Sequence, residues 1–194
     1  FWNYFWDYSK IIGIKSKQKI KRSKKFYKNL FLPGSKLNFG ENLLPKNNLD
    51  KAITFISENG FREQKTWKQL NLSTSKIIKF LRKINIKKGD RVVAYMPNTI
   101  QTVEAFIASS SIGSIWSSCS PDFGIRGVVE RFSQINPKVL FITDQYFYNG
   151  KKINILERLP EILKFIPSIK NVVVVNYPGK RLMKKFRKLK KIKL

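Results

Sequence analysis

Three segments of the chain combine polar side chains with turn residues in a way that could build a binding site. They are Met96-Pro97-Asn98, Ser117–Gly124 and Asp144–Gly150. Each lies at the end of a short apolar run that is typical of a strand. Open parallel sheets bind their ligands at the carboxyl ends of the strands. The sequence therefore predicts that these segments lie together at one edge of a sheet.

The residue types that the chain contains restrict the chemistry of such a site. The chain has no His and a single Cys, Cys119. Ser-His-Asp and Cys-His nucleophile systems, His-ligated metals and cysteine zinc clusters are therefore excluded. Because no base is near it in the sequence, we expect Cys119 to be a small buried side chain and not a nucleophile. We expect no catalytic residue and no metal ligand in this chain.

The common phosphate-binding motifs are also missing. No G-x-G-x-x-G follows a strand, and no G-x-S-x-G occurs. Gly150-Lys151 lacks both the upstream Gly and the following Ser or Thr of a P-loop. Composition and spacing alone indicate an α/β domain without identifying its ligand.

The elements that must position these segments alternate between strands and helices. Apolar or β-prone runs predict strands over residues 52–56, 61–65, 92–96, 114–118, 139–143 and 172–175. Helical spacing predicts helices over residues 66–84, 100–112, 125–135 and 153–166, the first of them starting at a Thr66-x-x-Gln69 capping box. Runs that are apolar at every position predict strands covered on both faces. We therefore predict an α/β fold, a parallel sheet flanked by helices in three layers, with a helical and loop extension before it.

The charge of the chain allows a second interpretation. The sequence has 39 Lys and Arg against 12 Asp and Glu, a net charge of +27. Nine of these cations lie in residues 180–194 and seven in residues 15–25. Such clusters can bind phosphates, so the alternative function is a non-catalytic basic module that binds nucleic acid or an acidic surface. The chain is rich in Lys, Ile and Asn, the residues of AT-rich codons, and no nucleic-acid motif is found, so no specific nucleic acid is expected.

No segment is expected to span a membrane. The longest uncharged stretch, Ala105–Pro121, contains seven Ser and is too polar for this. The first seven residues lack the basic and apolar regions of a signal peptide. A single Cys fits a reducing compartment, so we expect a cytoplasmic protein. The sequence assigns no oligomeric state.

Several blocks, taken in order, resemble a known family. The blocks are Leu37–Leu44, Gly89–Val92, Tyr95–Asn98, Ile115–Gly124, Pro137–Phe141 and Tyr148–Lys151. They are similar to the amino-terminal portion of the acetoacetyl-CoA synthetases, in the adenylate-forming acyl-CoA synthetase superfamily. The run from Trp116 to Gly124 is the most specific block, and the resemblance extends from about residue 1 to residue 178.

The resemblance implies an acid–thiol ligase that acts in two steps. Acetoacetate and ATP would form an acyl-adenylate and pyrophosphate, and the CoA thiol would then displace AMP. The resemblance also implies a division into an N-terminal extension (1–49), an incomplete AMP-binding domain (50–178) and a basic tail (179–194). The phosphate loop, the adenine motif and the catalytic lysine of the family do not occur here, so ATP and Mg are expected to bind outside this chain, which would be inactive alone. Another acid remains a third alternative.

The resemblance assigns one set of site residues. In related acetyl-CoA synthetases, the segment that matches Tyr148, Asn149, Gly150 and Lys151 contacts the nucleotide phosphates of CoA through two arginines. Here those two positions are Tyr148 and Lys151, which lack the bidentate guanidinium. Asn149-Gly150 can equally be a simple turn. We expect Asp122 to cap the following helix.

Overall fold

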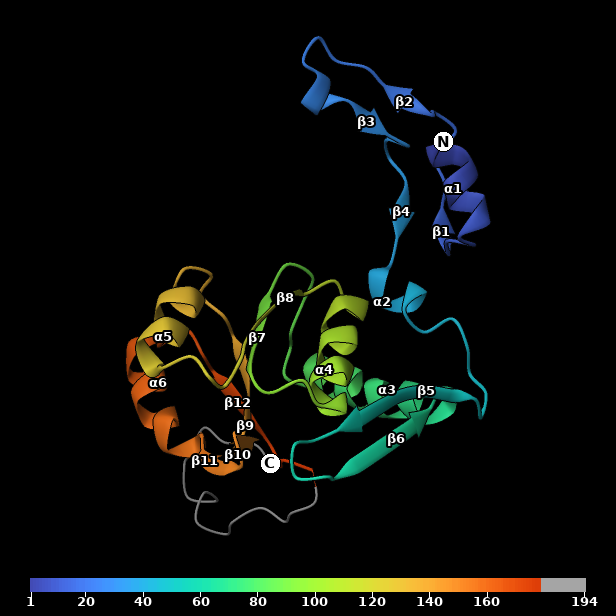
Figure 1. Cartoon of the computed structure of the whole chain (residues 1–194). Coiled ribbons are helices and arrows are strands. Elements are labelled where there is room, and N and C mark those ends of the chain that lie inside the picture. The colour runs from blue at the N-terminus through green and yellow to red at the C-terminus, as the bar shows by residue number, and fades with distance from the viewer. Residues whose placement is uncertain (179–194) are drawn as a thin grey trace. The chain divides into compact units, whose positions relative to one another are not determined.

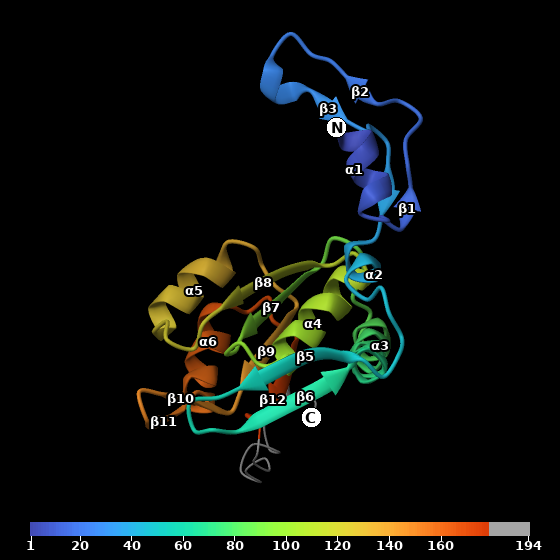
Figure 2. The same ribbon diagram turned by 45° about the vertical axis from the view of Figure 1, so that its right-hand side comes forward.

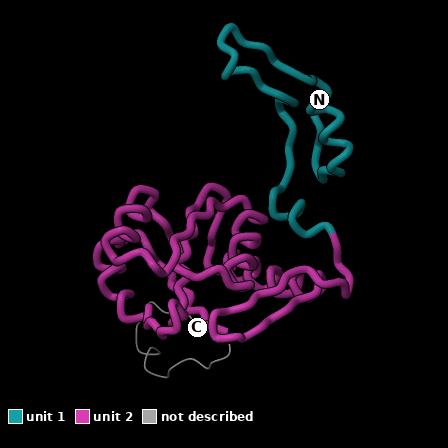
Figure 3. The backbone as a smooth tube through the Cα atoms, viewed as in Figure 1, with its two compact units in different colours: residues 1–45 teal, residues 46–194 magenta. Residues whose placement is uncertain are grey.

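The structure, a computed structural model, describes residues 1–178, and the basic tail proposed for residues 179–194 lies outside them. The chain divides into two compact units, one of Phe1–Pro45 and one that begins at Lys46 (Figure 3). We call them the N-terminal unit and the main unit.

The N-terminal unit contains short elements. Its helices are α1 (Trp2–Tyr8), the 3-10 turn η1 (Phe26–Lys28) and α2 (Phe39–Asn42). Two small antiparallel pairs join β1 (Gly13–Ile14) to β4 (Lys36–Leu37) and β2 (Ile20–Lys21) to β3 (Leu30–Phe31). The expected extension thus includes four short strands beside its helices and loops.

The main unit starts with a hairpin and a long helix, as predicted. β5 (Lys51–Ile56) pairs with β6 (Arg62–Thr66) around the Asn59-Gly60 turn, where Gly60 has a φ of 79°. A positive φ is easily adopted by Gly. Helix α3 (Trp67–Lys83) begins at the predicted capping box, because the Thr66 and Gln69 side chains each bond the other residue's backbone N–H.

Four of the remaining strands form a parallel sheet in the order β12-β9-β7-β8. They are β7 (Arg91–Tyr95), β8 (Ile115–Cys119), β9 (Val139–Thr143) and β12 (Asn171–Val175), and the connecting helices are α4 (Ile100–Ser111), α5 (Ile125–Ser133) and α6 (Leu159–Phe165). The predicted α/β fold, with helices on both faces of a parallel sheet, is confirmed (Figures 1 and 2).

The order of the strands determines which helix covers which face. The chain steps from β7 to β8 in one direction and then crosses β7 to reach β9 and β12 in the other direction. Right-handed crossovers in opposite directions place their helices on opposite faces. Accordingly, α3 and α4 pack with one face, around Leu81 and Ala108, and α5 and α6 pack with the other, around Phe132 and Leu159. Strand β9 is buried at every position, whereas β12, at the sheet edge, is fully buried only at alternate positions.

One predicted helix is partly wrong. Residues 153–166 do not form a single helix, because Lys151–Asn154 is a strand, β11, that pairs antiparallel with β10 (Gln145–Tyr148). The 3-10 turn η2 (Leu156–Arg158) follows, and α6 begins only at Leu159, with Pro160 in its first turn. Asn149 and Gly150, with φ values of 49° and 69°, reverse the chain between the strands. Asn-Gly is the preferred pair for such a turn, and here it decides the pairing over the helical spacing of apolar residues.

Candidate functional site

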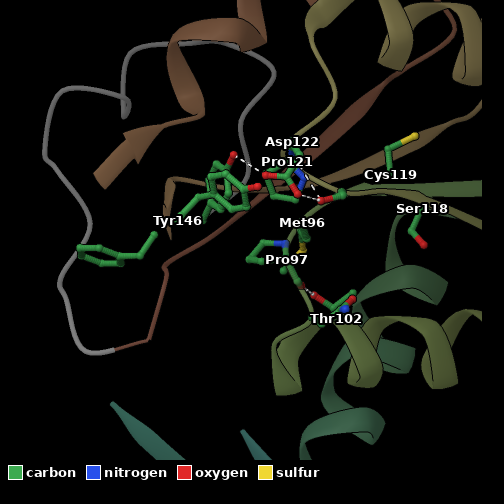
Figure 4. A pocket seen from close by; sticks show the side chains of 12 residues that line it. Met96, Pro97, Thr102, Ser118, Cys119, Pro121, Asp122 and Tyr146 are labelled. Atoms are coloured by element: carbon green, nitrogen blue, oxygen red, sulfur yellow. Dashed lines mark hydrogen bonds between the residues drawn. The ribbon is translucent and has the colours of Figure 1, made fainter. Parts of the chain in front are cut away.

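A cavity of about 250 Å³ opens at the carboxyl edge of the parallel sheet (Figure 4). All three segments that the sequence singles out contribute to it. Its walls are Met96, Pro97, Asn98, Thr102, Ser118, Cys119, Ser120, Pro121, Asp122, Tyr146, Phe147 and Tyr148. The prediction that these segments meet is therefore confirmed.

The position of the cavity follows from the topology. Strands β7 and β9 are neighbours, but the chain leaves β7 toward β8 on one side and leaves β9 toward β12 on the other. The loops that follow the two strands therefore turn away from each other and leave a crevice, which is where open α/β sheets bind ligands. The cavity lies between the segment after β7 and the hairpin that follows β9.

The first wall is the turn after β7. The Thr102 hydroxyl donates a hydrogen bond of 2.6 Å to the Pro97 carbonyl oxygen, so the first turn of α4 holds the Met96–Asn98 segment. Thr99 is the N-cap residue of α4, although its side chain makes no capping bond. The turn is thus fixed by a side chain from inside the helix.

The second wall is the loop after β8, residues 120–124. The side chains of Arg158 and Tyr95 hold this loop by hydrogen bonds to its carbonyl oxygens. The guanidinium Nη1 of Arg158 donates to the carbonyl oxygens of Pro121 and Phe123, at 3.0 and 3.1 Å. The hydroxyl of the fully buried Tyr95 lies among the same groups, within hydrogen-bond distance of Arg158 and of both carbonyls. Burial raises the pKa of this hydroxyl, so Tyr95 stays neutral and can donate.

Asp122 joins this loop to the third wall. Its Oδ1 accepts a bond of 2.7 Å from the Tyr146 hydroxyl and its Oδ2 accepts a bond of 2.7 Å from Ser120 Oγ (Figure 4). Burial, followed by the bond to Asp122, raises the pKa of Tyr146 to about 12, so the hydroxyl keeps its proton. The prediction that Asp122 caps the next helix is wrong, because α5 starts after Gly124 and has no side-chain cap.

The four predicted site residues lie at the tip of the β10–β11 hairpin. Tyr148 and Lys151 face each other in register, and Asn149-Gly150 forms the turn between them. Tyr148 also lines the cavity and is 55% exposed. Asn149 and Gly150 do form a turn, which is compatible both with a simple turn and with a ligand contact. The side chains of Tyr148 and Lys151 are both exposed at the tip.

Cys119 lies in the wall of the cavity but is only 4% exposed. Burial raises the pKa of its thiol, so the group stays protonated. A protonated thiol is a poor nucleophile. This agrees with the expectation of an inert, small side chain. Trp116 is partly buried against the core, and its ring centroid lies 6.1 Å from that of Phe106 and 6.2 Å from that of Phe141.

Within residues 1–178, no group of three or more His, Cys, Asp or Glu side chains could hold a metal ion. Over the same residues, no helix is both long and apolar enough to cross a membrane.

Comparison with known proteins identifies the family of the chain. The sequence model of the AMP-binding enzymes matches residues 46–192, which is most of the chain. The chain belongs to the AMP-binding enzyme family. This family match includes most of the basic tail and begins one residue after the N-terminal unit ends.

Similar members of the AMP-binding family include acetoacetyl-CoA synthetases of animals and bacteria. The protein of Gallus gallus is 42% identical over 93% of this chain, and that of Rhizobium meliloti (strain 1021) is 37% identical over 92%. These alignments cover 28% and 27% of the two relatives, so the chain spans less than a third of their length. A malonamoyl-CoA synthetase of Penicillium aethiopicum is 34% identical over 90% of this chain, and the alignment covers 25% of that relative.

A solved structure of an AMP-binding enzyme gives the same fold. An acetoacetyl-CoA synthetase from Streptomyces lividans superimposes with a TM-score of 0.84 at 28% identity, covering 95% of this chain and 29% of that one. The resemblance drawn from the ordered sequence blocks is therefore confirmed.

The sequence missed the residues that hold the walls of the cavity. Asp122 and Tyr146 are 24 positions apart, and Tyr95 and Arg158 are 63 positions apart. Local spacing carries no signal for such contacts, because they depend on how the crossovers bring the loops together. The one usable signal is that one Tyr, Tyr95, ends strand β7 and another, Tyr146, follows the end of β9 by three residues.

Proposed function

We propose that this chain is the N-terminal part of an acid–thiol ligase that converts acetoacetate, ATP and CoA into acetoacetyl-CoA, AMP and pyrophosphate. The observation that carries the proposal is the 42% identity over 93% of the chain to an acetoacetyl-CoA synthetase. The TM-score of 0.84 to a solved synthetase of that name supports it. The malonamoyl-CoA synthetase relative makes another small acid the alternative substrate.

The chemistry of the proposed reaction is the activation of a carboxylate. A carboxylate is a poor electrophile, whereas its mixed anhydride with AMP has a good leaving group. The CoA thiol attacks the carbonyl carbon of that anhydride, forms the thioester and releases AMP. The contribution of this chain is to bind CoA, and no residue from 1 to 178 is assigned to the acid, to ATP or to Mg.

We place the nucleotide phosphates of CoA at the tip of the β10–β11 hairpin, at Tyr148, Asn149, Gly150 and Lys151. Two observations support this: the tip is exposed, and Tyr148 lines the cavity at the switch point of the sheet. Lys151 would offer a point charge and Tyr148 one hydroxyl, which is weaker than a pair of guanidinium groups. The walls of the cavity are neutral except for Asp122, so it suits the uncharged parts of CoA better than its phosphates.

We propose that residues 1–49 form the N-terminal extension and that residues 50–178 are an incomplete AMP-binding domain. The division of the structure at Pro45 and the start of the family match at residue 46 support a boundary in this region. We also propose a cytoplasmic location, because the single Cys is buried as a free thiol. Cell fractionation with an antibody to the chain would test the location.

A chimera tests the ligase function. Residues 1–178 would replace the matching segment of the Gallus gallus acetoacetyl-CoA synthetase, and thioester formation would be measured with acetoacetate, malonamate and acetate. We expect acetoacetyl-CoA from the chimera and no thioester from the 194-residue chain alone. Thioester formation by the chain alone would contradict its assignment as part of an enzyme.

Two neighbouring lysines test the CoA site in the same chimera. Lys151→Ala should raise the KM for CoA by roughly three- to tenfold with little change in kcat, the range expected for one exposed phosphate contact. Lys152→Ala is the matched control, because it removes the same charge one position away. An equal effect of both variants, lost together as salt is raised, would favour the basic-module alternative.

A further inference from the structure

The hairpin that carries Lys151 is joined to the loop after β8 by the bond between Tyr146 and Asp122. Tyr146 is 6% exposed, and its hydroxyl is 2.7 Å from Asp122 Oδ1. Figure 4 shows the two side chains pointing toward each other, with a dashed line for the bond between them. The bond therefore spans from the wall after β8 to the wall after β9.

Because Tyr146 lies on the same strand as Tyr148, its position determines where the tip of the β10–β11 hairpin lies. Residues two apart on a strand point to the same side, so Tyr146 and Tyr148 share a face of the hairpin, and both line the cavity. Tyr148 is paired with Lys151, and Tyr146 is paired with Ile153. A shift of Tyr146 would therefore move the pair at the tip.

The same bond also controls the one carboxylate in the cavity wall. Both oxygens of Asp122 accept hydrogen bonds, one from Tyr146 and one from Ser120 Oγ. Two donors therefore hold this carboxylate in one orientation. The bond thus fixes the orientation of this carboxylate as well as the hairpin.

We propose that Asp122 and Tyr146 act together as positioning residues for the CoA site, by holding the hairpin tip at the distance from the β8 loop at which Lys151 meets a nucleotide phosphate. This inference rests on the proposed function, because it assigns a task to residues beside the proposed CoA contacts. The ligand chemistry is that of a phosphorylated adenosine.

Hydrogen exchange of the 194-residue chain tests the link without any ligand. In Tyr146→Phe and in Asp122→Ala, the amides of residues 145–154 should exchange roughly three- to tenfold faster, as expected for the loss of one hydrogen bond. Asp122→Asn should restore the wild-type rate, because its amide oxygen can still accept from Tyr146. Unchanged exchange in both disruptive variants would overturn the inference.

Binding of adenosine 3′,5′-bisphosphate, measured at constant ionic strength, tests the consequence. Tyr146→Phe and Asp122→Ala should each weaken binding by roughly three- to tenfold, and the double variant should be no weaker than either one, because both remove the same bond. Tyr27→Phe, at an exposed ring in the N-terminal unit, is the control for the loss of a hydroxyl.

The outcomes separate this inference from the proposed function. If Lys151→Ala weakens binding and Tyr146→Phe does not, the CoA site stands and the positioning role fails. Fully additive effects in the double variant would likewise refute a joint role. If exchange rises as expected but Lys151→Ala has no effect on binding, the mechanical link is supported and the proposed CoA site fails.

Discussion

Lys65 Nζ lies 2.5 Å from Glu104 Oε1, so the β5–β6 hairpin is tied to helix α4 by a buried ion pair. The Glu104 side chain is only 4% exposed and that of Lys65 is 20% exposed. The hydroxyl of Ser73, on α3, bonds the same carboxylate oxygen. Strand β6 and helices α3 and α4 are therefore held together by bonds to the Glu104 carboxylate.

Removing one partner of this pair should be costly. Lys65→Met leaves the Glu104 carboxylate buried without its counter-charge, and we expect a loss of about 3–5 kcal/mol in the free energy of unfolding. Urea unfolding followed by circular dichroism would measure it. The double variant Lys65→Met/Glu104→Leu should recover much of the loss, since it leaves no buried charge. A single variant that loses less than about 1 kcal/mol would show that the pair is well hydrated.

Asp90 should make the stability of the chain depend on acid pH. Lys138 Nζ is 2.7 Å from Asp90 Oδ1, and the Lys87 N–H donates to Oδ2 at 2.9 Å. The bond to Lys138, followed by that to Lys87, holds the pKa of this carboxyl below its ordinary value of 3.8. The stabilisation is therefore complete above the unfolded pKa and is lost as pH falls through the lower folded pKa. Asp90→Asn should cost about 1–2 kcal/mol at pH 7 and progressively less below pH 4.

Asp144 should have the opposite effect on the pH dependence of stability and serves as a control for Asp90. Burial raises the pKa of its carboxyl, although Oδ1 accepts bonds from the Tyr177 and Gln145 N–H groups. A raised folded pKa means that protonation favours the folded state, so this contribution grows as pH falls. The difference in unfolding free energy between wild type and Asp144→Asn should therefore change with pH in the direction opposite to that for Asp90→Asn. Parallel slopes for the two variants would contradict one of the two assignments, and the sign of the slope would show which.

The predictable part of the fold is the part encoded by local residue types. The Asn59-Gly60 turn, the Thr66 capping box and the apolar run of β9 each identify an element from a few neighbouring positions. The hairpin at Asn149-Gly150 shows where this fails. The Asn-Gly pair favours a hairpin, whereas the spacing of the apolar residues that follow favours a helix. The structure has the hairpin, in which β10 pairs with β11.

The candidate site was predictable in location but not in detail. Parallel strands must end at one edge, so the three segments could be expected to meet there. Which side chains bond across the edge depends on the direction of each crossover and on the depth of each loop. Asp122 illustrates this: its sequence position suits a helix cap, yet it accepts a bond from Tyr146 instead.

The hydrogen bonds from Arg158 to the loop after β8 give a further prediction. Arg158 donates to two loop carbonyls and to the Tyr95 hydroxyl from one planar group. Arg158→Met should cost about 2–3 kcal/mol and expose the amides of residues 120–124 to exchange, because the single proton of the Tyr95 hydroxyl can satisfy only one of the two carbonyls. Arg158→Lys should restore only part of the loss, since all three bonds come from Nη1 and the Lys ammonium ends one atom closer to the backbone. If Lys restores everything, charge alone and not geometry anchors the loop.

Two turn glycines allow a matched test of the hairpin tip. Gly150 has a φ of 69° and Gly60 a φ of 79°, and an added Cβ would meet no atom within 4 Å at either position. Alanine should therefore cost about 1 kcal/mol of unfolding free energy at each, from backbone strain and not from a clash. Because Gly150 lies next to Lys151 and Gly60 lies in the β5–β6 turn, only Gly150→Ala should also weaken binding of adenosine 3′,5′-bisphosphate. Isothermal titration of both variants would measure this, and equal losses of affinity would mean that the hairpin tip has no special role in binding.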